Sequence, residues 1–256
     1  IPVSWLSGGM IAVGAAALLG APVTVPVGLR DVVYFIVGLS LGSAVTPESL
    51  HSVARWPLSV FGMAITVILI TFVSYTILRR RGGWDWQDAF LASAPGALSL
   101  IVSLSESCKA DSPRIVLVQS LRVALLILLL PPLLGVFGHQ TVAIDLSARA
   151  GVFDLVQTLL LVLAGLLGLG ACMLIRVPSA SLLGALLGSA LMHATGQSDV
   201  TMPGWLVIPS LVVMGAIVGS RFRGIEPSTL RRSFVDGLLT FAATFAVALG
   251  AAFIAA

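Results

Sequence analysis

The sequence predicts an all-α polytopic membrane helix bundle of about eight transmembrane helices plus a re-entrant hairpin, arranged as two inverted-topology repeats. Three observations predict this fold class: the composition, the spacing of the apolar stretches and the distribution of the basic residues. Of the 256 residues, 58% are hydrophobic and 10% are charged, and the mean hydropathy is +1.08. A chain with so few polar side chains cannot cover the surface of a water-soluble globule of this length. The lipid bilayer is therefore the expected environment.

Apolar stretches recur along the whole chain, each close to the roughly 20 residues that a helix needs to cross the hydrocarbon. Leu, Ala and Val dominate them, and the two-residue alternation of a membrane barrel strand is absent. Helices are therefore expected to satisfy the backbone polar groups. The expected spans are residues 4–21, 28–46, 54–79, 113–136, 152–175, 179–195, 203–221 and 229–254.

The ends, the cysteines and the net charge narrow the class further. The chain begins with Ile1, and its first residues lack the charged start and cleavage site of a signal peptide, so a trimmed sequence is expected. Cys108 and Cys172 form no CxxC motif and indicate no redox compartment. The excess of 14 Lys+Arg over 11 Asp+Glu is small, and such residues in a membrane protein report orientation. No nucleic-acid partner is expected.

A repeat relates the two ends of the chain. Shifting the sequence by 177 positions superposes Gly38-Leu-Ser-Leu-Gly-Ser43 on Gly215-Ala-Ile-Val-Gly-Ser220. The paired Pro, Gly and Ser spacings favour duplication over a chance likeness of apolar helices, with a first repeat at 1–140 and a second at 141–256 that is truncated at its C-terminus. The superposed pairs are Leu6 and Leu183, Pro26 and Pro203, Leu29 and Leu206, Gly38 and Gly215, Gly42 and Gly219, and Ser43 and Ser220.

The segment from Gln87 to Ser107 decides the topology. Ala94-Pro95-Gly96-Ala97 interrupts it, so it is not expected to form one continuous helix. If it crossed the membrane, only five of the thirteen Lys and Arg other than Arg122 would lie on the cytoplasmic face, with Arg79-Arg80-Arg81 among the five. If it enters and leaves on one face as a re-entrant hairpin, eleven do. The positive-inside rule therefore favours the hairpin over residues 87–107.

This topology has a consequence for the repeats. The first three spans and their superposed mates then run in opposite senses through the bilayer, so the two halves are inverted. An inverted repeat with a Pro- and Gly-interrupted helix is typical of secondary transporters, with a site near the midplane where the halves meet. A helix before Ile1 and a second hairpin and last helix after Ala256 are expected to complete the pattern.

Arg122 is the leading candidate for ligand binding. It lies about ten residues into a predicted span, where a guanidinium costs at least about 2.5 kcal/mol unless it is paired or hydrated. Its planar fork suits a carboxylate, which predicts an anion anchor. The equal alternative is an internal ion pair with Asp154, Glu106 or Asp236, or a side chain that reaches the membrane surface if the helix sits lower in the bilayer. For Asp154 and Asp236, which lie near span ends, simple hydration is favoured over a proton-relay role.

The hairpin supplies the other candidate ligands. A half-helix that begins after Pro95 and Gly96 would point free N–H groups, which carry partial positive charge, toward an anion. Serine and glutamine side chains could add hydrogen bonds, although serine in membrane helices more often bonds the backbone. The candidate substrate-binding residues are Arg122, Gln119, Ala97, Leu98, Ser99 and Ser103, with Ser93 as a further donor.

Enzyme chemistry is not expected. Gly38-Leu-Ser40-Leu-Gly42 matches the GxSxG pattern of serine hydrolases, but no strand surrounds it and its repeat mate carries Ile217 in place of Ser40. Glycines spaced four apart, as in Gly38 and Gly42 or Gly215 and Gly219, instead favour close helix packing. The three histidines are dispersed at 51, 139 and 193, so neither a metal site nor a cofactor is predicted.

The glycine motif and its mate, together with Ala94-Pro-Gly-Ala-Leu-Ser99 and Val118-Gln-Ser-Leu-Arg122, resemble the AbrB family of bacterial inner-membrane proteins. The resemblance spans essentially the whole chain and implies a multi-pass protein of the bacterial inner membrane. Members of that family are often labelled ammonia monooxygenases or regulators of gene expression. The family run is typically Pro-Gly-Gly followed by an acidic residue, whereas Ala97 and Leu100 stand at these places here.

These observations lead to two hypotheses about function. The first is an inner-membrane, transporter-like protein that moves a small anionic metabolite by alternating access, with the hairpin and Arg122 at its centre. The second is a membrane-embedded regulator of gene expression or scaffold without transport, in which Arg122 forms a structural ion pair. The lipid bilayer is a partner in both, and a homo-oligomer is left open.

Overall fold

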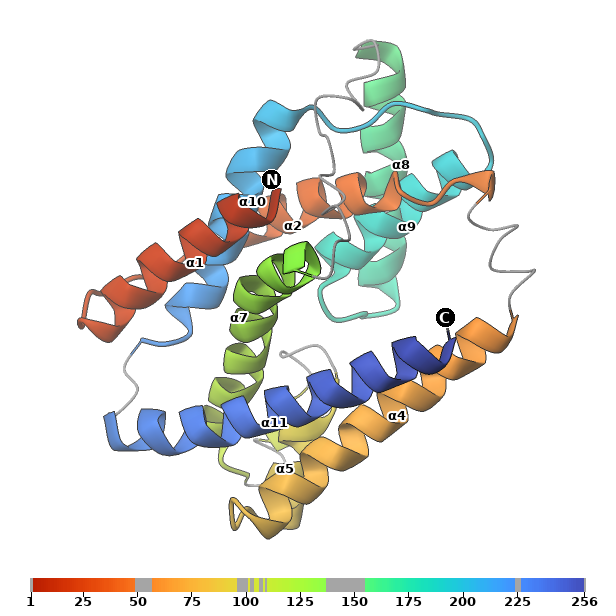
Figure 1. Cartoon of the computed structure of the whole chain (residues 1–256). Helices are drawn as coiled ribbons and strands as arrows, with labels where there is room; N and C mark the ends of the chain where they lie inside the picture. The colour runs from red at the N-terminus through yellow and green to blue at the C-terminus, as the bar shows by residue number, and fades with distance from the viewer. Residues whose placement is uncertain are drawn as a thin grey trace. The chain divides into compact units, whose positions relative to one another are not determined.

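All secondary structure that the structure describes is helical. The computed structural model describes residues 2–48, 57–95, 101, 104–105, 108, 110–136, 155–223 and 227–255, and no strand occurs among them. The all-α prediction is thus confirmed over these residues. The helices are α1 (Pro2–Leu18), α2 (Val27–Gly42), α4 (Pro57–Arg80), α5 (Trp86–Ser93), α7 (Ser112–Val136), α8 (Leu155–Leu174), α9 (Ala180–Ala194), α10 (Gly204–Ser220) and α11 (Pro227–Ala255) (Figure 1).

Within the described residues, four helices are long and apolar enough to cross a membrane. They are the stretches Phe61–Arg80, Ser112–Leu129, Leu155–Leu174 and Ser233–Ala252 of α4, α7, α8 and α11. The helices α1, α9 and α10 are apolar but shorter, with 15 to 17 residues each. Apolar helices of these lengths are consistent with a membrane protein, while the number of crossings stays a prediction.

The chain divides into two compact units. The first unit comprises Ile1–Ala54 and Leu130–Arg223, and the second comprises Arg55–Leu129 and Gly224–Ala256. Each unit takes helices from both predicted halves, 1–140 and 141–256, so the units do not coincide with the repeats. The repeat boundaries stay a prediction.

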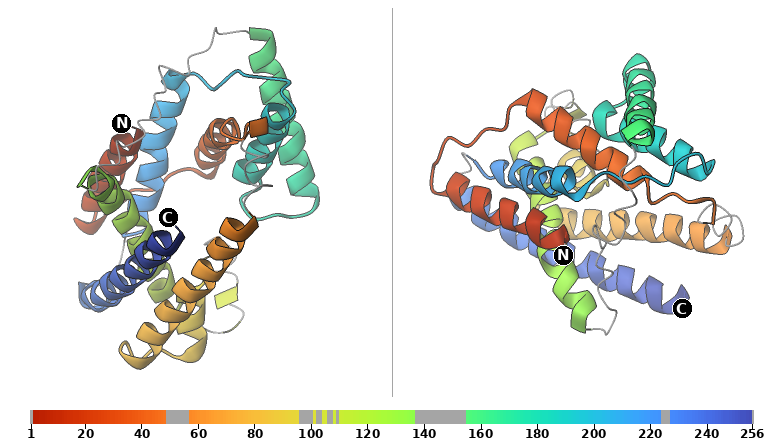
Figure 2. Two further views of the ribbon diagram at one scale, coloured as in Figure 1. Left: turned by 45° about the vertical axis from the view of Figure 1, so that its right-hand side comes forward. Right: turned by 90° about the horizontal axis from the view of Figure 1, so that it is seen from above.

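In the first unit, α2 packs against α9 at backbone contact (Figure 2). A Cβ added to Gly38 would lie 2.5 Å from the carbonyl oxygen of Leu182, and one added to Gly42 would lie 2.5 Å from that of Leu186. Because the residue numbers rise together along the contact, the two helices run parallel. Glycines four residues apart permit such close approach, since a side chain at either position would overlap the neighbouring backbone.

The helices α1 and α10 of the same unit make a matching contact. A Cβ added to Gly219 would lie 2.6 Å from the carbonyl oxygen of Met10, and one at Gly215 would overlap the carbonyl oxygen of Leu6. These helices are parallel as well. The two contacts therefore use glycine pairs of the same spacing, each against the backbone of a helix that runs in the same direction.

The helices α8 and α9 form an antiparallel pair, in which a Cβ at Gly184 would lie 2.5 Å from Leu169 Cα and one at Gly188 would lie 2.9 Å from the nitrogen of Gly165. Beyond the end of α10, Arg221 interacts with the side chain of Tyr34 in α2. The start of α2, the end of α8, the start of α9 and the end of α10 thus meet at one end of the first unit.

The charges of the first unit are unevenly divided between its two ends. At the end where α2 and α9 start, the described charged residues are Arg30, Asp31, Arg176, Arg221 and Arg223. Beyond the opposite helix ends, Glu48 and Asp199 are the described charged residues. We call the first of these the arginine-rich end. In the predicted topology it faces the cytoplasm, as the positive-inside rule requires.

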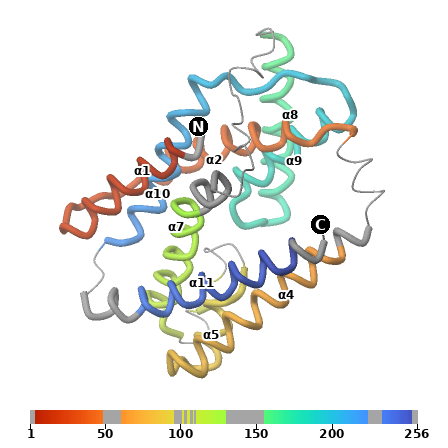
Figure 3. The backbone as a smooth tube through the Cα atoms, in the orientation of Figure 1, coloured from red at the N-terminus to blue at the C-terminus, as the bar shows by residue number. Residues whose placement is uncertain are grey.

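In the second unit, α4 and α11 lie side by side and run in opposite directions, with α5 against α4 (Figure 3). The described charged residues other than Arg122 gather where α4 ends and where α5, α7 and α11 start, which we call the charged end. Those whose side chains the structure describes are Arg79, Arg80, Arg81, Asp85, Asp88, Asp111, Arg114 and Asp236, and Arg231 and Arg232 lie in the first turns of α11. Below this end, Leu78, Trp84, Ala89, Leu91, Ala92, Ile101, Ile115 and Val118 form a buried core.

Candidate functional site

The helix α5 breaks where the sequence predicts a break. It ends at Ser93, and Ala94 is already extended, with φ −62° and ψ 127°. Pro95 follows, which disfavours helical backbone in the residue before it and cannot donate to the preceding turn. Residues 87–107 therefore do not form one continuous helix.

The chain returns to the charged end after this break. The backbone N–H of Asp111, just before α7, donates to the Asp88 carboxylate at the start of α5, with an N···O distance of 3.2 Å. A second link joins the hydroxyls of Ser105 and Ser112. The chain thus leaves the charged end through α5 and is back at that end before α7, which agrees with the predicted re-entrant hairpin.

Gln119 caps the broken end of α5. The carbonyl of Leu91 would normally accept the N–H of the residue four positions later, but that residue is Pro95, which has none. The side-chain Nε2 of Gln119 supplies the missing donor at 2.7 Å from the Leu91 oxygen. Gln119 is 2% exposed, so this hydrogen bond is buried.

Arg122 lies about one turn after Gln119 in α7, and its side chain reaches Ser93, the last residue of α5. Its Nη1 donates to the carbonyl oxygen of Ser93 at 3.3 Å. A cation at this place is favoured because the C-terminal end of a helix carries partial negative charge. Arg122 lies ten residues after the start of α7, which places its Cα about 15 Å along the helix.

The structure thus brings two of the predicted ligands, Gln119 and Arg122, to one broken helix end. Pro95 lies beside them, exposed, and lines a cavity of about 360 Å³ between α4 and α5. The remaining candidates of the hairpin, namely Gly96, Ala97, Leu98, Ser99 and Ser103, lie outside the described residues. Of the proposed ion-pair partners of Arg122, Glu106 and Asp154 also lie outside them.

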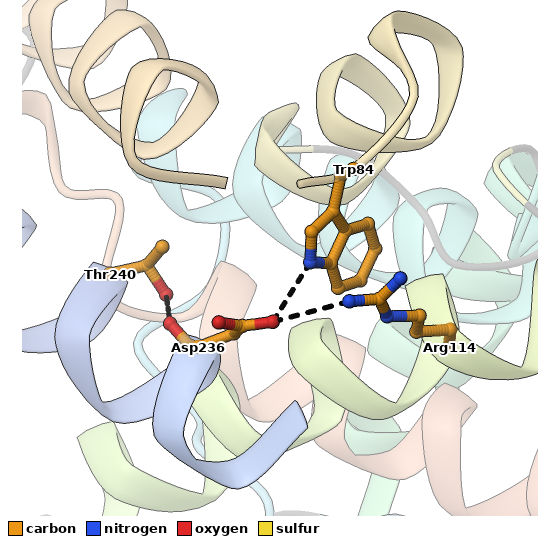
Figure 4. A network of polar contacts seen from close by, with 4 residues as sticks. All are labelled: Trp84, Arg114, Asp236 and Thr240. Atoms are coloured by element: carbon orange, nitrogen blue, oxygen red, sulfur yellow. Dashed lines mark hydrogen bonds and ion pairs between the residues drawn. The ribbon is translucent and has the colours of Figure 1, made fainter. Parts of the chain in front are cut away.

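Asp236, the third proposed partner of Arg122, pairs with another arginine instead. It pairs with Arg114 at 3.4 Å and accepts a hydrogen bond from Trp84 Nε1 at 2.8 Å (Figure 4). The Arg114 guanidinium also stacks over the Trp84 ring, 3.9 Å from its centroid. The expectation that Asp236 is simply hydrated is therefore wrong. Its side chain is only 16% exposed, and it is held by both the ion pair with Arg114 and the hydrogen bond from Trp84.

Sequence reasoning did not find this network. Trp84 and Asp236 are 152 positions apart, and Arg114 is 122 positions from Asp236 along the chain, so no local pattern links the three. The one local signal was Trp84 itself, a large aromatic residue in a Gly-rich turn. Within the described residues, no group of three or more His, Cys, Asp or Glu side chains could hold a metal ion.

A family model described as "Transition state regulatory protein AbrB" matches residues 5–256. The chain belongs to the AbrB family. Among curated proteins, this AbrB-family chain is 30% identical over 201 residues to "Uncharacterized protein YhjN" of Bacillus subtilis, covering 73% of the chain and 52% of that protein. It is 24% identical over 242 residues to "Putative regulator AbrB" of Escherichia coli, covering 87% of the chain and 64% of that protein. The chain thus spans between half and two thirds of these relatives, and no solved structure matches it.

Replacing Gln119 with Leu is expected to lower the free energy of unfolding by about 1–3 kcal/mol, because the buried Leu91 carbonyl loses its donor. Unfolding of the AbrB-family protein in detergent micelles, followed by circular dichroism, measures this change. Adding Pro95→Ala should restore part of the loss, because alanine supplies an N–H at the position that lacks one. A loss below about 0.5 kcal/mol, or no rescue by the second substitution, would contradict the capping role.

Proposed function

We propose that this AbrB-family chain belongs to an inner-membrane transporter that moves a small organic anion by alternating access. The observation that carries the proposal is the position of Arg122 and Gln119 at a broken helix end, well inside a candidate membrane span. Interrupted helices with polar groups at this depth are typical of transporter binding sites. A guanidinium there favours a carboxylate or phosphate, which it can bind with two parallel hydrogen bonds.

The charge distribution of the second unit supports an anionic substrate. All its described charged side chains except Arg122 gather at the charged end. Arg122 donates one described hydrogen bond, to the carbonyl oxygen of Ser93, whereas a guanidinium carries five N–H donors. Donors are therefore left for a ligand at the hairpin, where the predicted half-helix N–H groups of Ala97, Leu98 and Ser99 would complete the site.

The contacts of the first unit support inverted repeats. Consecutive spans run in opposite directions through a bilayer. If the halves had the same orientation, α1 and its mate α9 would be parallel, so α1 and α10 would be antiparallel. The observed parallel packing of α1 on α10, and of α2 on α9, instead agrees with inverted halves. In that arrangement the first helix of each half packs against the second helix of the other half. Inverted halves are the basis of alternating access in many transporters.

The glycine contacts also refine the alignment of the proposed repeats. They match Leu6 with Leu182, because these carbonyl groups face Gly215 and Gly38 in the same way. The constant shift of 177 positions pairs Leu6 with Leu183 instead. A connection one residue longer between α9 and α10 than between α1 and α2 accounts for the difference.

Uptake by proteoliposomes tests the transport proposal. We expect saturable uptake of at least one member of a panel of labelled carboxylates and phosphate esters, and Arg122→Gln should reduce it by at least about tenfold, because a charge-assisted hydrogen bond contributes about 1.5–3 kcal/mol. Arg80→Gln is the matched control, since it removes an exposed charge at the charged end and should leave uptake unchanged. Uptake that is insensitive to Arg122→Gln would contradict the proposed site.

The second candidate function is a membrane-embedded regulator or scaffold without transport. The names of the family and of the Escherichia coli relative favour it. Cysteines placed at Ser99 and Ser103 separate the two proposals. Labelling of these positions by a water-soluble maleimide, blocked by a solute of the panel, supports transport. Uniformly inaccessible positions and no uptake of any solute support the regulator.

A further inference from the structure

A groove on the first unit lies at its arginine-rich end. Its volume is about 450 Å³, and it lies between α2 and α8 where α9 starts. Its walls are apolar over most of their length and polar only where the helices begin or end. The apolar wall residues are Val32, Phe35, Leu166, Leu169 and Met173.

The mouth of the groove is basic. Arg30 and Asp31 both line it and form an ion pair at 3.3 Å, with side chains 44% and 49% exposed. Arg221 lies close enough to Arg30 for the two guanidinium groups to repel each other. Arg176 stands in the turn that joins α8 to α9, between Met173 and Ser179, which both line the groove. The cations outnumber the acids here, which leaves positive charge for an anionic group.

The walls decide which anion fits. A small water-soluble anion would gain nothing from a long apolar wall, whereas a lipid fills it with an acyl chain. The helix α8 is a candidate membrane span, and only 17% of that span is buried, so lipid already covers most of this helix in a bilayer. Basic grooves between membrane helices on the cytoplasmic side are a known setting for anionic lipid headgroups.

We infer that this groove binds one anionic phospholipid, with the headgroup at Arg30 and one acyl chain along α8. The inference concerns the first unit and does not depend on the transport site of the second. It needs the arginine-rich end to lie at the membrane surface, which the charge division between the two ends supports. Asp31 then limits the affinity by competing with the headgroup for Arg30.

Native mass spectrometry of the purified protein tests the inference, with phosphatidylglycerol and phosphatidylcholine titrated in detergent. The wild-type protein should retain phosphatidylglycerol at lower lipid concentration than phosphatidylcholine. Arg30→Gln should weaken phosphatidylglycerol binding about fivefold, since a basic side chain near anionic lipid contributes about 1 kcal/mol. Asp31→Asn should strengthen it, a gain that damage to the fold cannot produce.

Three controls make the result decisive. Arg223→Gln removes an exposed arginine at the same end that does not line the groove, and should change the affinity less than twofold. Val32→Trp should block the groove, whereas Leu167→Trp, on the exposed face of α8 outside it, should not. Equal binding of the two lipids, equal effects of Arg30→Gln and Arg223→Gln, or displacement of the lipid by millimolar inorganic phosphate would overturn the inference.

Discussion

Gly42→Ala is expected to lower the free energy of unfolding by about 3 kcal/mol or more, and to separate α2 from α9. The added Cβ would lie 2.5 Å from the Leu186 carbonyl oxygen and 2.6 Å from Ser189 Cβ. Neither neighbour can rotate away, because the first belongs to the backbone of α9 and the second is fixed to it. Detergent-solubilised protein unfolded with dodecyl sulfate and followed by circular dichroism measures the loss.

The control for this prediction is Gly170→Ala in α8. A Cβ at Gly170 would meet nothing within 4 Å, so only the helix propensity changes. Alanine is favoured over glycine in a helix by about 0.5–1 kcal/mol, so this variant should be slightly stabilised. The two substitutions are chemically identical and should act in opposite directions. Equal effects would mean that close packing of α2 on α9 is not what Gly42 provides.

Trp84→Ala is the second substitution with a large expected effect, a loss of about 3–5 kcal/mol in the free energy of unfolding. The indole is 1% exposed, and its removal leaves a cavity in the core of the second unit. The substitution also removes the indole N–H that donates to the Asp236 carboxylate, and the aromatic face on which the Arg114 guanidinium lies. Thermal unfolding in detergent, again by circular dichroism, gives the magnitude.

Two further variants separate the contributions of Trp84. Trp84→Phe keeps most of the apolar volume and the aromatic face but loses the hydrogen bond to Asp236, and should cost about 1–3 kcal/mol. Asp236→Asn keeps a side-chain acceptor for the indole but removes the charge that pairs with Arg114. If Trp84→Phe destabilises as much as Trp84→Ala, the hydrogen bond rather than the packing dominates, and the cavity argument fails.

The local features of the fold follow directly from the sequence. A proline at 95 both ends a helix and removes one N–H, so the break after Ser93 could be predicted from residue type alone. The same holds for the helices over the apolar stretches, because their composition and length leave few other structures in a bilayer. These features depend on residues within one or two turns of each other.

The partners of the polar residues could not be predicted in this way. Pro95 implies that the Leu91 carbonyl needs another donor, but only the packing of α7 on α5 identifies Gln119 as that donor. Arg122 was expected to bind an anion or an acidic side chain, and its partner in the described part of the chain is a backbone carbonyl. Asp236 pairs with Arg114 because α11 and α7 start at the same end, which no local pattern reveals.

We propose that the broken segment enters and leaves the bilayer on the cytoplasmic face, and the natural thiol of Cys108 tests this topology most directly. Cys108 is exposed and stands just past the hairpin, while Cys172 is buried and can be replaced by alanine. A membrane-impermeant maleimide should label Cys108 in inside-out vesicles and not in intact spheroplasts, as it should label Asp85→Cys in the turn between α4 and α5. Labelling of Cys108 and Asp85→Cys from opposite faces would contradict the hairpin and the inverted topology built on it.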